Sequence, residues 1–157
     1  MNNFMAAGIL IMAMTVPTTI PSGIDQFLVT EAVEEETLDD IYIIPKESLE
    51  LLALVVMSEA EGESELGKRL VVDTVLNRVD SEYFPNSIRS VVYQDGASSS
   101  ISDGRIGKCY VTDENFRIAE EEVEKRTNSE VIFFRTERYS IYGVPLFNEG
   151  HHYFSGM

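Results

Sequence analysis

The sequence is poor in the residue types that hold metals. Cys109 is the only cysteine among 157 residues, so no disulfide can form within the chain and no cluster of thiolates can bind a metal. The two histidines, His151 and His152, are adjacent. Neighbouring residues on a strand point to opposite faces, so these two side chains would not chelate one metal together. With no HExxH pair and no third clustered ligand, we expect neither a metal nor another cofactor.

Basic residues are also scarce. The chain has 12 Lys and Arg against 27 Asp and Glu, which gives a net charge of −15. A protein that binds nucleic acid or an anionic membrane surface needs Lys and Arg to release counterions, so this charge argues against both partners. The same charge also serves solubility, and that explanation is equally good.

The N-terminal part lacks an apolar run long enough to span a bilayer. Residues 4–16 are uncharged and apolar but fall short of the ~20 residues that a spanning helix needs. Their length suits a signal peptide, although Met1–Asn3 carry no Lys or Arg. We predict that residues 1–23 are an export signal or a short membrane anchor, which places the protein outside the cytoplasm. The acidic residues 24–47 predict a solvated linker.

From residue 48 to residue 157 the pattern is that of one α+β domain. Helices are predicted from Ser48 to about Ala60, from the N-cap Ser64 to Val79, over Ser87–Tyr93, and from Thr112 or Asp113 through Lys125. Residues 94–108 are rich in Gly, Ser and Asp and predict a long loop. Short β-like runs at 131–134 and 152–154, with a turn at Gly143 and Pro145 between them, predict a small antiparallel sheet near the C-terminus.

One stretch has the composition of a general acid site. Glu59, Glu61 and Glu63 surround Gly62 where the first predicted helix ends. The negative end of the helix dipole, repulsion between the carboxylates and the apolar side of the helix all disfavour a further negative charge, as a general acid requires. On spacing alone, however, three solvated glutamates around a turn explain the pattern better.

Several motifs occur together in an order that resembles one family. The pattern E-A-x-G-E at 59–63 is followed by L-N-R-V at 76–79, F-P-N-x-I at 84–88, Y-Q at 93–94, S-D-G at 102–104 and H-Y-F at 152–154. This series, which spans residues 48–157, resembles the SleB-type cell wall hydrolases, the family of spore cortex-lytic enzymes. The resemblance implies a lysozyme-like domain that acts on the glycan strands of peptidoglycan, and we expect it to be a monomer.

The resemblance also implies roles for individual residues. Glu59 matches the catalytic acid of the family. Spore cortex members behave as lytic transglycosylases, in which one carboxyl protonates the glycosidic oxygen and then removes the proton of the C6 hydroxyl, closing a 1,6-anhydro ring. We expect Glu63 to support the turn or the cleft. The predicted substrate-binding residues are Glu63, Asn77, Tyr93, Gln94, Ser102, Asp103, His152 and Tyr153.

The chain departs from the family pattern after Gln94. Relatives carry Gln and an aromatic residue where this chain has Ala97 and Ser98, and Glu61 stands where a basic or small residue is more usual. A polar contact and a stacking surface for the glycan are therefore missing. The alternative prediction is a catalytically weak peptidoglycan-binding or adaptor protein on the same fold. An amidase that cuts the peptide is a distant third, because the expected metal ligands are absent.

Overall fold

The computed structural model describes residues 44–97 and 99–157. The signal or anchor predicted for residues 1–23, most of the predicted linker and Ser98 lie outside the described residues. The end of that linker differs from the prediction, because Lys46 and Glu47 begin helix α1 (Lys46–Ala60) directly after Pro45. Among the residues described, no helix is long and apolar enough to cross a membrane.

The remaining longer helices begin and end within two residues of their predicted bounds. They are α2 (Glu65–Asp80), α3 (Ile88–Val92) and α5 (Asp113–Glu124). Each starts after a hydroxyl side chain that accepts a hydrogen bond from a free backbone N–H of the first turn, which satisfies a donor that the helix itself cannot. The caps are Ser64 with Gly67 N at 3.1 Å, Ser87 with Ser90 N at 3.2 Å, and Thr112 with Asn115 N at 3.1 Å.

The segment predicted as a long loop is partly helical. It contains the short helix α4 (Ser99–Ser102) and the 3₁₀ helix η1 (Arg105–Lys108). The two are joined by Gly104, whose φ of 75° lies in the left-handed region that glycine adopts without strain. Asp103 Oδ1 accepts a hydrogen bond from Arg105 N at 2.9 Å and fixes this turn.

The predicted sheet is present near the C-terminus, which confirms the α+β class, and it has one strand more than the sequence indicated. β1 (Phe133–Thr136), β2 (Val144–Glu149) and β3 (His152–Gly156) form an antiparallel sheet of order β1-β3-β2. The turn expected at Gly143 and Pro145 is wrong at Pro145, which lies in β2. Proline is tolerated there because β2 is an edge strand. β1 starts two residues later than predicted, since Asn128 Oδ1 first binds the N–H groups of Glu130 and Val131.

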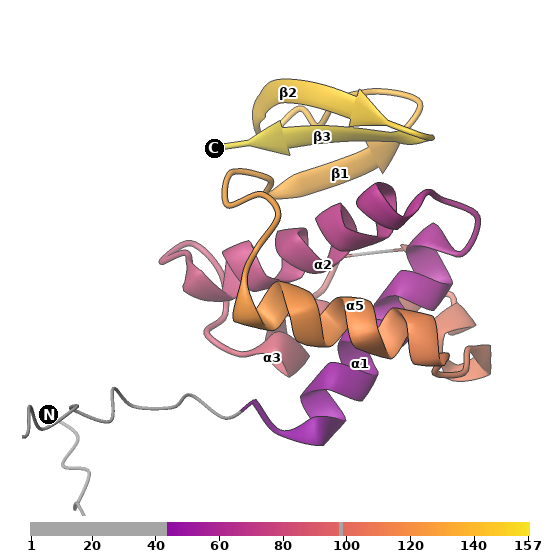
Figure 1. Cartoon of the computed structure of the whole chain (residues 1–157). Helices are drawn as coiled ribbons and strands as arrows, with labels where there is room; N and C mark the ends of the chain where they lie inside the picture. The colour runs from indigo at the N-terminus through magenta and orange to yellow at the C-terminus, as the bar shows by residue number, and fades with distance from the viewer. Residues whose placement is uncertain (1–43, 98) are drawn as a thin grey trace, which may run out of the picture. The chain divides into compact units, whose positions relative to one another are not determined.

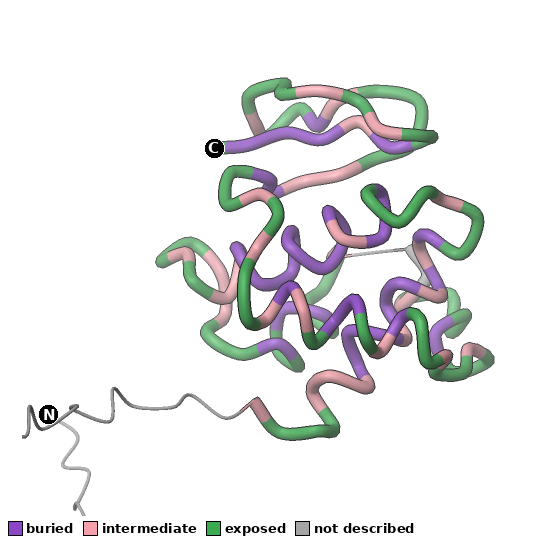
Figure 2. Tube along the Cα trace, viewed as in Figure 1, coloured by how far each residue is buried: buried purple, intermediate pink, exposed green. Residues whose placement is uncertain are grey.

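Helix α2 lies between the sheet and the other helices (Figure 1). Its residues are buried along most of its length, and β3 is the most buried strand (Figure 2). Two apolar clusters hold the layers together. The larger joins α1, α2, α3 and α5 through residues such as Leu52, Val56, Val71, Val91 and Ile118, and the smaller joins α2 to the sheet through Leu70, Val131 and Phe154.

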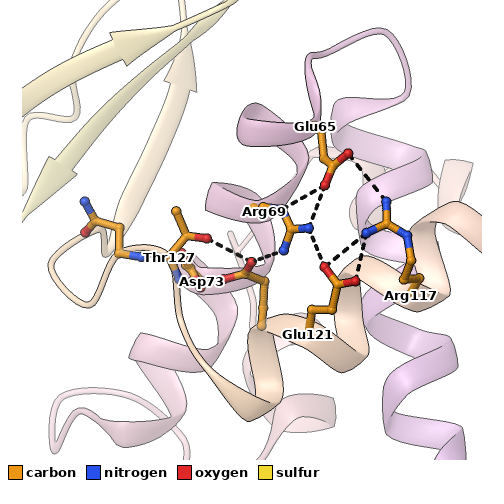
Figure 3. Close-up of polar contacts among 8 residues, drawn as sticks. Glu65, Arg69, Asp73, Arg117, Glu121 and Thr127 are labelled. Carbon is orange, nitrogen blue, oxygen red and sulfur yellow. Dashed lines mark hydrogen bonds and ion pairs between the residues drawn. The ribbon is translucent and has the colours of Figure 1, made fainter.

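A network of charges fastens α5 to α2 (Figure 3). Arg69 Nη1 donates to Glu122 Oε1 at 2.7 Å, and its Nη2 contacts Glu65 Oε1 at 2.6 Å as well as Glu121. Glu122 is fully buried, while Glu65 and Glu121 are on the surface. Arg69 therefore neutralises a charge in the interior and reaches solvent with the same side chain.

Candidate active site

Glu59 is the second-last residue of α1 and borders two adjoining hollows. One is a small pocket of ≈ 20 Å³ with a largely apolar lining: Val55, Val75, Arg78, Val91, Val92, Ala97, Ile101 and Phe134. The other is an open cleft of ≈ 490 Å³ between the end of α1 and the segment 105–110. A cleft of this volume accommodates a small-molecule ligand or one unit of a polymer. The half-buried Glu59 thus has apolar surroundings on one side and a solvent-filled cleft on the other.

Arg78 brings a half-buried positive charge to the small pocket. Its Nε donates to the carbonyl oxygen of Ile132 at 2.7 Å, and its guanidinium lies 5.4 Å and 5.5 Å from the ring centres of Phe84 and Phe133. Burial lowers the pKa of Arg78 to about 10, so it stays positively charged at neutral pH. The pocket therefore combines one carboxyl, Glu59, with one fixed cation.

The loop after α1 is held by the tip of the β2–β3 hairpin. Glu63 accepts hydrogen bonds from His151 N at 3.1 Å, and its Oε1 lies 2.8 Å from His151 Nδ1. Ser64 donates to Glu149 Oε1 at 2.7 Å. We call these four residues, Glu63, Ser64, Glu149 and His151, the hairpin clasp. The clasp joins the loop that follows Glu59 to a segment about 85 residues away in the chain.

The clasp keeps Glu63 ionised. Partial burial raises the pKa of the Glu63 carboxyl, but the hydrogen bonds from the His151 side chain and backbone outweigh this effect and lower it. Glu63 is thus a carboxylate with its oxygens occupied by His151. This arrangement differs from the protonated state that a general acid needs.

The two histidines have different surroundings. His151 is exposed, whereas His152 is buried and packs against Phe134, with ring centres 5.0 Å apart. Burial lowers the pKa of His152, and the carboxylates of Glu63 and Glu59 only partly offset this. Nδ1 of His152 has no hydrogen-bond partner among the described residues. The His152 ring lies close enough to Glu59 for the charge of that carboxylate to act on its pKa.

Two further predicted substrate-binding residues are held by the protein itself. Asn77 is buried, and its Nδ2 donates to the carbonyl oxygens of Asn128 and Val131, both at 2.9 Å. Asn77 thereby fixes the turn before β1. Tyr153 is half-buried and packs edge-on against Tyr139, with ring centres 5.1 Å apart. The structure gives both residues a packing role, and neither lines the two hollows beside Glu59.

The other predicted residues surround α3 and α4. Tyr93 and Gln94 follow α3 and are exposed, and the Tyr93 ring lies 5.2 Å from the guanidinium carbon of Arg89. Ser102 ends α4, and Asp103 accepts from Arg105 N, as described above. None of these four residues lines the small pocket or the open cleft. Asp103 acts on the cleft indirectly, by orienting Arg105.

The residues around Glu59 include some that the sequence did not single out. Arg105, Lys108 and Tyr110 form the wall of the cleft opposite α1, and Arg78 lines the small pocket. Arg78 lies within the L-N-R-V motif and Arg105 directly follows S-D-G, so these two motifs could have indicated both residues. Lys108 and Tyr110 had no such signal, because the sequence around them shows neither helical nor strand periodicity.

Comparisons with known proteins agree with this architecture. The family model described as Cell Wall Hydrolase matches residues 62–154. The spore cortex-lytic enzymes of Bacillus cereus and Bacillus subtilis (strain 168) are each 38% identical over 58 residues, which is 37% of this chain and 22% and 19% of theirs. The chain thus matches about a fifth of the length of these curated relatives.

Two solved structures share the fold. The catalytic domain of the Bacillus cereus SleB protein aligns with a TM-score of 0.65 at 22% identity, covering 73% of this chain and 93% of that domain. The catalytic domain of the germination-specific lytic transglycosylase SleB from Bacillus anthracis gives 0.62 at 22% identity, covering 71% and 96%. These alignments confirm the lysozyme-like fold that the motifs predicted. With a family model that matches more than half of the residues, the chain belongs to the SleB-type cell wall hydrolases.

Proposed function

We propose that this protein cleaves the glycan strands of peptidoglycan, with Glu59 as the general acid and base. The observation that supports this most strongly is the position of Glu59 between an apolar pocket and an open cleft. The matched family range begins at Gly62, so the role of Glu59 rests on its motif and its geometry.

The chemistry uses one carboxyl twice. Protonated Glu59 donates its proton to the glycosidic oxygen as that bond breaks, and the leaving sugar departs as an alcohol. The resulting carboxylate then accepts the proton of the C6 hydroxyl on the sugar that has lost its neighbour. The C6 oxygen attacks the anomeric carbon of that same sugar and closes a 1,6-anhydro ring. The proton returns to Glu59, so the cycle is complete without water.

A second carboxylate is not required by this route. A retaining or inverting glycosidase uses two carboxyl groups on opposite sides of the scissile bond. Among the described residues, Glu59 is the only carboxylic acid that lines the small pocket, and Glu59 and Glu61 are the only two that line the cleft. The two residues are two positions apart near the end of α1. Glu61 is exposed beyond the helix. This arrangement favours transglycosylation over hydrolysis.

The products distinguish the two reactions. Purified protein is incubated with peptidoglycan from vegetative walls and from spore cortex, and the soluble fragments are analysed by mass spectrometry. We expect fragments that end in 1,6-anhydro sugars, which are 18 Da lighter than the reducing ends that hydrolysis leaves, the mass of one water molecule. Release of reducing ends alone would contradict the transglycosylase assignment.

A catalytically weak wall-binding protein is the second candidate. The observation that favours it is Ala97, which lines the pocket beside Glu59 and offers a substrate no polar side chain there. Such a protein would sediment with insoluble wall material and release no fragments. Under either function we propose that the protein works outside the cytoplasm as a monomer, with residues 1–23 as the export signal or membrane anchor, the residues from 24 to Pro45 as the linker, and the residues from Lys46 to Met157 as the cell wall hydrolase domain.

A further inference from the structure

Half of the basic residues of this acidic protein form ion pairs with carboxylates within the described ranges. Lys68 lies 3.1 Å from Glu114, and Arg126 lies 2.7 Å from Asp80. Lys108 forms no ion pair with any residue of the described ranges, and it is an exposed residue that lines the cleft beside Glu59. The cleft therefore holds a positive charge that the protein leaves available to a ligand.

Arg105 adds a second cation to the same wall. Its Nη1 donates to the carbonyl oxygen of Ser58 at 3.3 Å, and its Nη2 lies 3.5 Å from Asp103 Oδ2. The side chain is nevertheless 57% exposed, so part of the guanidinium faces solvent. The contact with Ser58, next to Glu59 in α1, fixes the position of Arg105 relative to the proposed general acid.

The 3₁₀ geometry of η1 puts the two cations on one side. Side chains at positions i and i+3 of a 3₁₀ helix lie above one another, and Arg105 and Lys108 have this spacing. Both line the open cleft, together with Tyr110, whose side chain is 64% exposed. Two cations beside an exposed aromatic ring form a surface that suits a sugar with an anionic substituent, because the ring covers the sugar face and the cations bind the charge.

We propose that Arg105, Lys108 and Tyr110 form a subsite for a carboxylate on the glycan, so that the preferred substrate is a strand whose sugars carry peptides with free carboxylates. This proposal rests on the proposed function, because it specifies the substrate of the same cleft. The chain as a whole carries a net charge of −15, which repels an anionic strand. The two cations of the subsite therefore also determine where the strand docks.

The test compares two forms of one substrate. Soluble glycan strands with intact peptides are used directly, or after their carboxylates are converted to neutral N-methylamides by carbodiimide coupling. The full-length protein should cleave the carboxylate form with a kcat/KM about five- to tenfold higher, as expected for two partly exposed charge contacts. Raising the salt concentration should reduce this ratio, because exposed charges are screened.

Variants assign the preference to the two side chains. R105Q/K108Q should bring the ratio close to one, and K108Q alone, which leaves the Arg105–Ser58 contact intact, should lower it in part. Because the readout is a ratio measured on one variant, a general loss of folding or activity cancels. K46Q/K125Q is the control, since it removes the same charge from two exposed residues that do not line the cleft, and it should keep the ratio unchanged.

The outcomes separate this proposal from the proposed function. Cleavage of both forms at equal rates by the unmodified protein, or an unchanged ratio in R105Q/K108Q, would overturn the subsite. If neither form is cleaved, the proposed glycan cleavage itself fails, and the subsite proposal fails with it.

Discussion

At the scale of single residues, Gly150 is the position that tests the hairpin clasp. Its φ is +55°, which disfavours any side chain, and a Cβ there would lie 1.8 Å from Glu63 Oε2. We expect Gly150→Ala to displace the Glu63 carboxylate from His151 and to lower the free energy of unfolding by about 1–3 kcal/mol. Urea unfolding followed by circular dichroism measures this change.

Gly62 provides the matched control on the other side of the same contact. It precedes Glu63, its φ lies outside the left-handed region, and a Cβ there would meet no atom within 4 Å. Gly62→Ala should therefore change stability by no more than about 0.5 kcal/mol. Equal losses in the two variants would show that the close approach of Gly150 to Glu63 is unimportant.

The sequence predicted the clasp only in part. The motif indicated that Glu63 supports the turn, but its partners lie about 85 residues further along the chain. No local pattern links Glu63 to His151, because the pairing arises when the β2–β3 hairpin folds back. Asn77 shows the same limit. Its motif suggested substrate contact, whereas its amide group holds two carbonyl oxygens in the interior.

At the scale of elements, Arg69 controls the packing of α2 against α5. Its guanidinium contacts Glu65, Glu121 and the buried Glu122. Arg69→Gln leaves Glu122 as a buried charge without its cation, so we expect a loss of about 3–5 kcal/mol. Thermal unfolding at neutral pH measures the effect.

Arg117 is the control for this network because it also contacts Glu65 and Glu121 but does not reach Glu122. Its side chain is 46% exposed, and both contacts are on the surface. Arg117→Gln should cost about 1 kcal/mol or less. A loss as large as that of Arg69→Gln would mean that the surface pairs, and not the buried charge, hold the two helices together.

Helices were predicted more accurately than strands. The hydroxyl caps Ser64, Ser87 and Thr112 set helix starts by local hydrogen bonds, which the sequence shows directly. Strand β2 was missed because it is mostly exposed, contains Pro145 and is irregular between Pro145 and Phe147. Its pairing with β3 is a tertiary contact that alternation of residue types does not reveal.

At the scale of the whole molecule, a buried carboxyl pair makes stability depend on pH. Asp73 is fully buried beside Glu122, and burial together with the neighbouring carboxylate raises the pKa of Asp73 from 3.8 to about 8. Asp73 and Glu122 share one proton through a hydrogen bond between their carboxyl groups. Asp73 Oδ1 has no partner among the described residues, so it lacks the donors that an ionised carboxylate would need. The folded protein therefore keeps a proton that the unfolded chain releases.

The sign of the dependence follows from this proton. The stabilisation from protonated Asp73 is fully present below pH 3.8 and is lost as the pH rises towards 8, by at most about 1.4 kcal/mol per pH unit. Asp73→Asn keeps a donor for Glu122 and does not titrate. We expect its stability relative to the unmodified protein to increase steadily between pH 5 and 8 in urea unfolding. The lowered pKa of His152 affects both proteins equally and cancels in the difference. Parallel stability curves would contradict the shared proton.

The proposed active site is itself a property of the whole fold. Glu59 comes from α1, the apolar pocket from α2, α3 and β1, and the wall of the cleft from η1 and the residues after it. The sequence placed Glu59 correctly at the end of a helix. The cations of the cleft were not predicted, because they become neighbours of Glu59 only when residues 105–110 fold against the end of α1.

The central claim is that Glu59 carries the proton in glycan cleavage, and one comparison tests it most directly. Glu59→Gln and Glu61→Gln remove the same charge at two residues that line one cleft. We predict that Glu59→Gln lowers the rate of muropeptide release by at least ~100-fold, the usual contribution of a general acid. Glu61→Gln should stay within about threefold of the unmodified protein, as a surface change outside the chemistry would. Equal rates for Glu59→Gln and the unmodified protein would contradict the account.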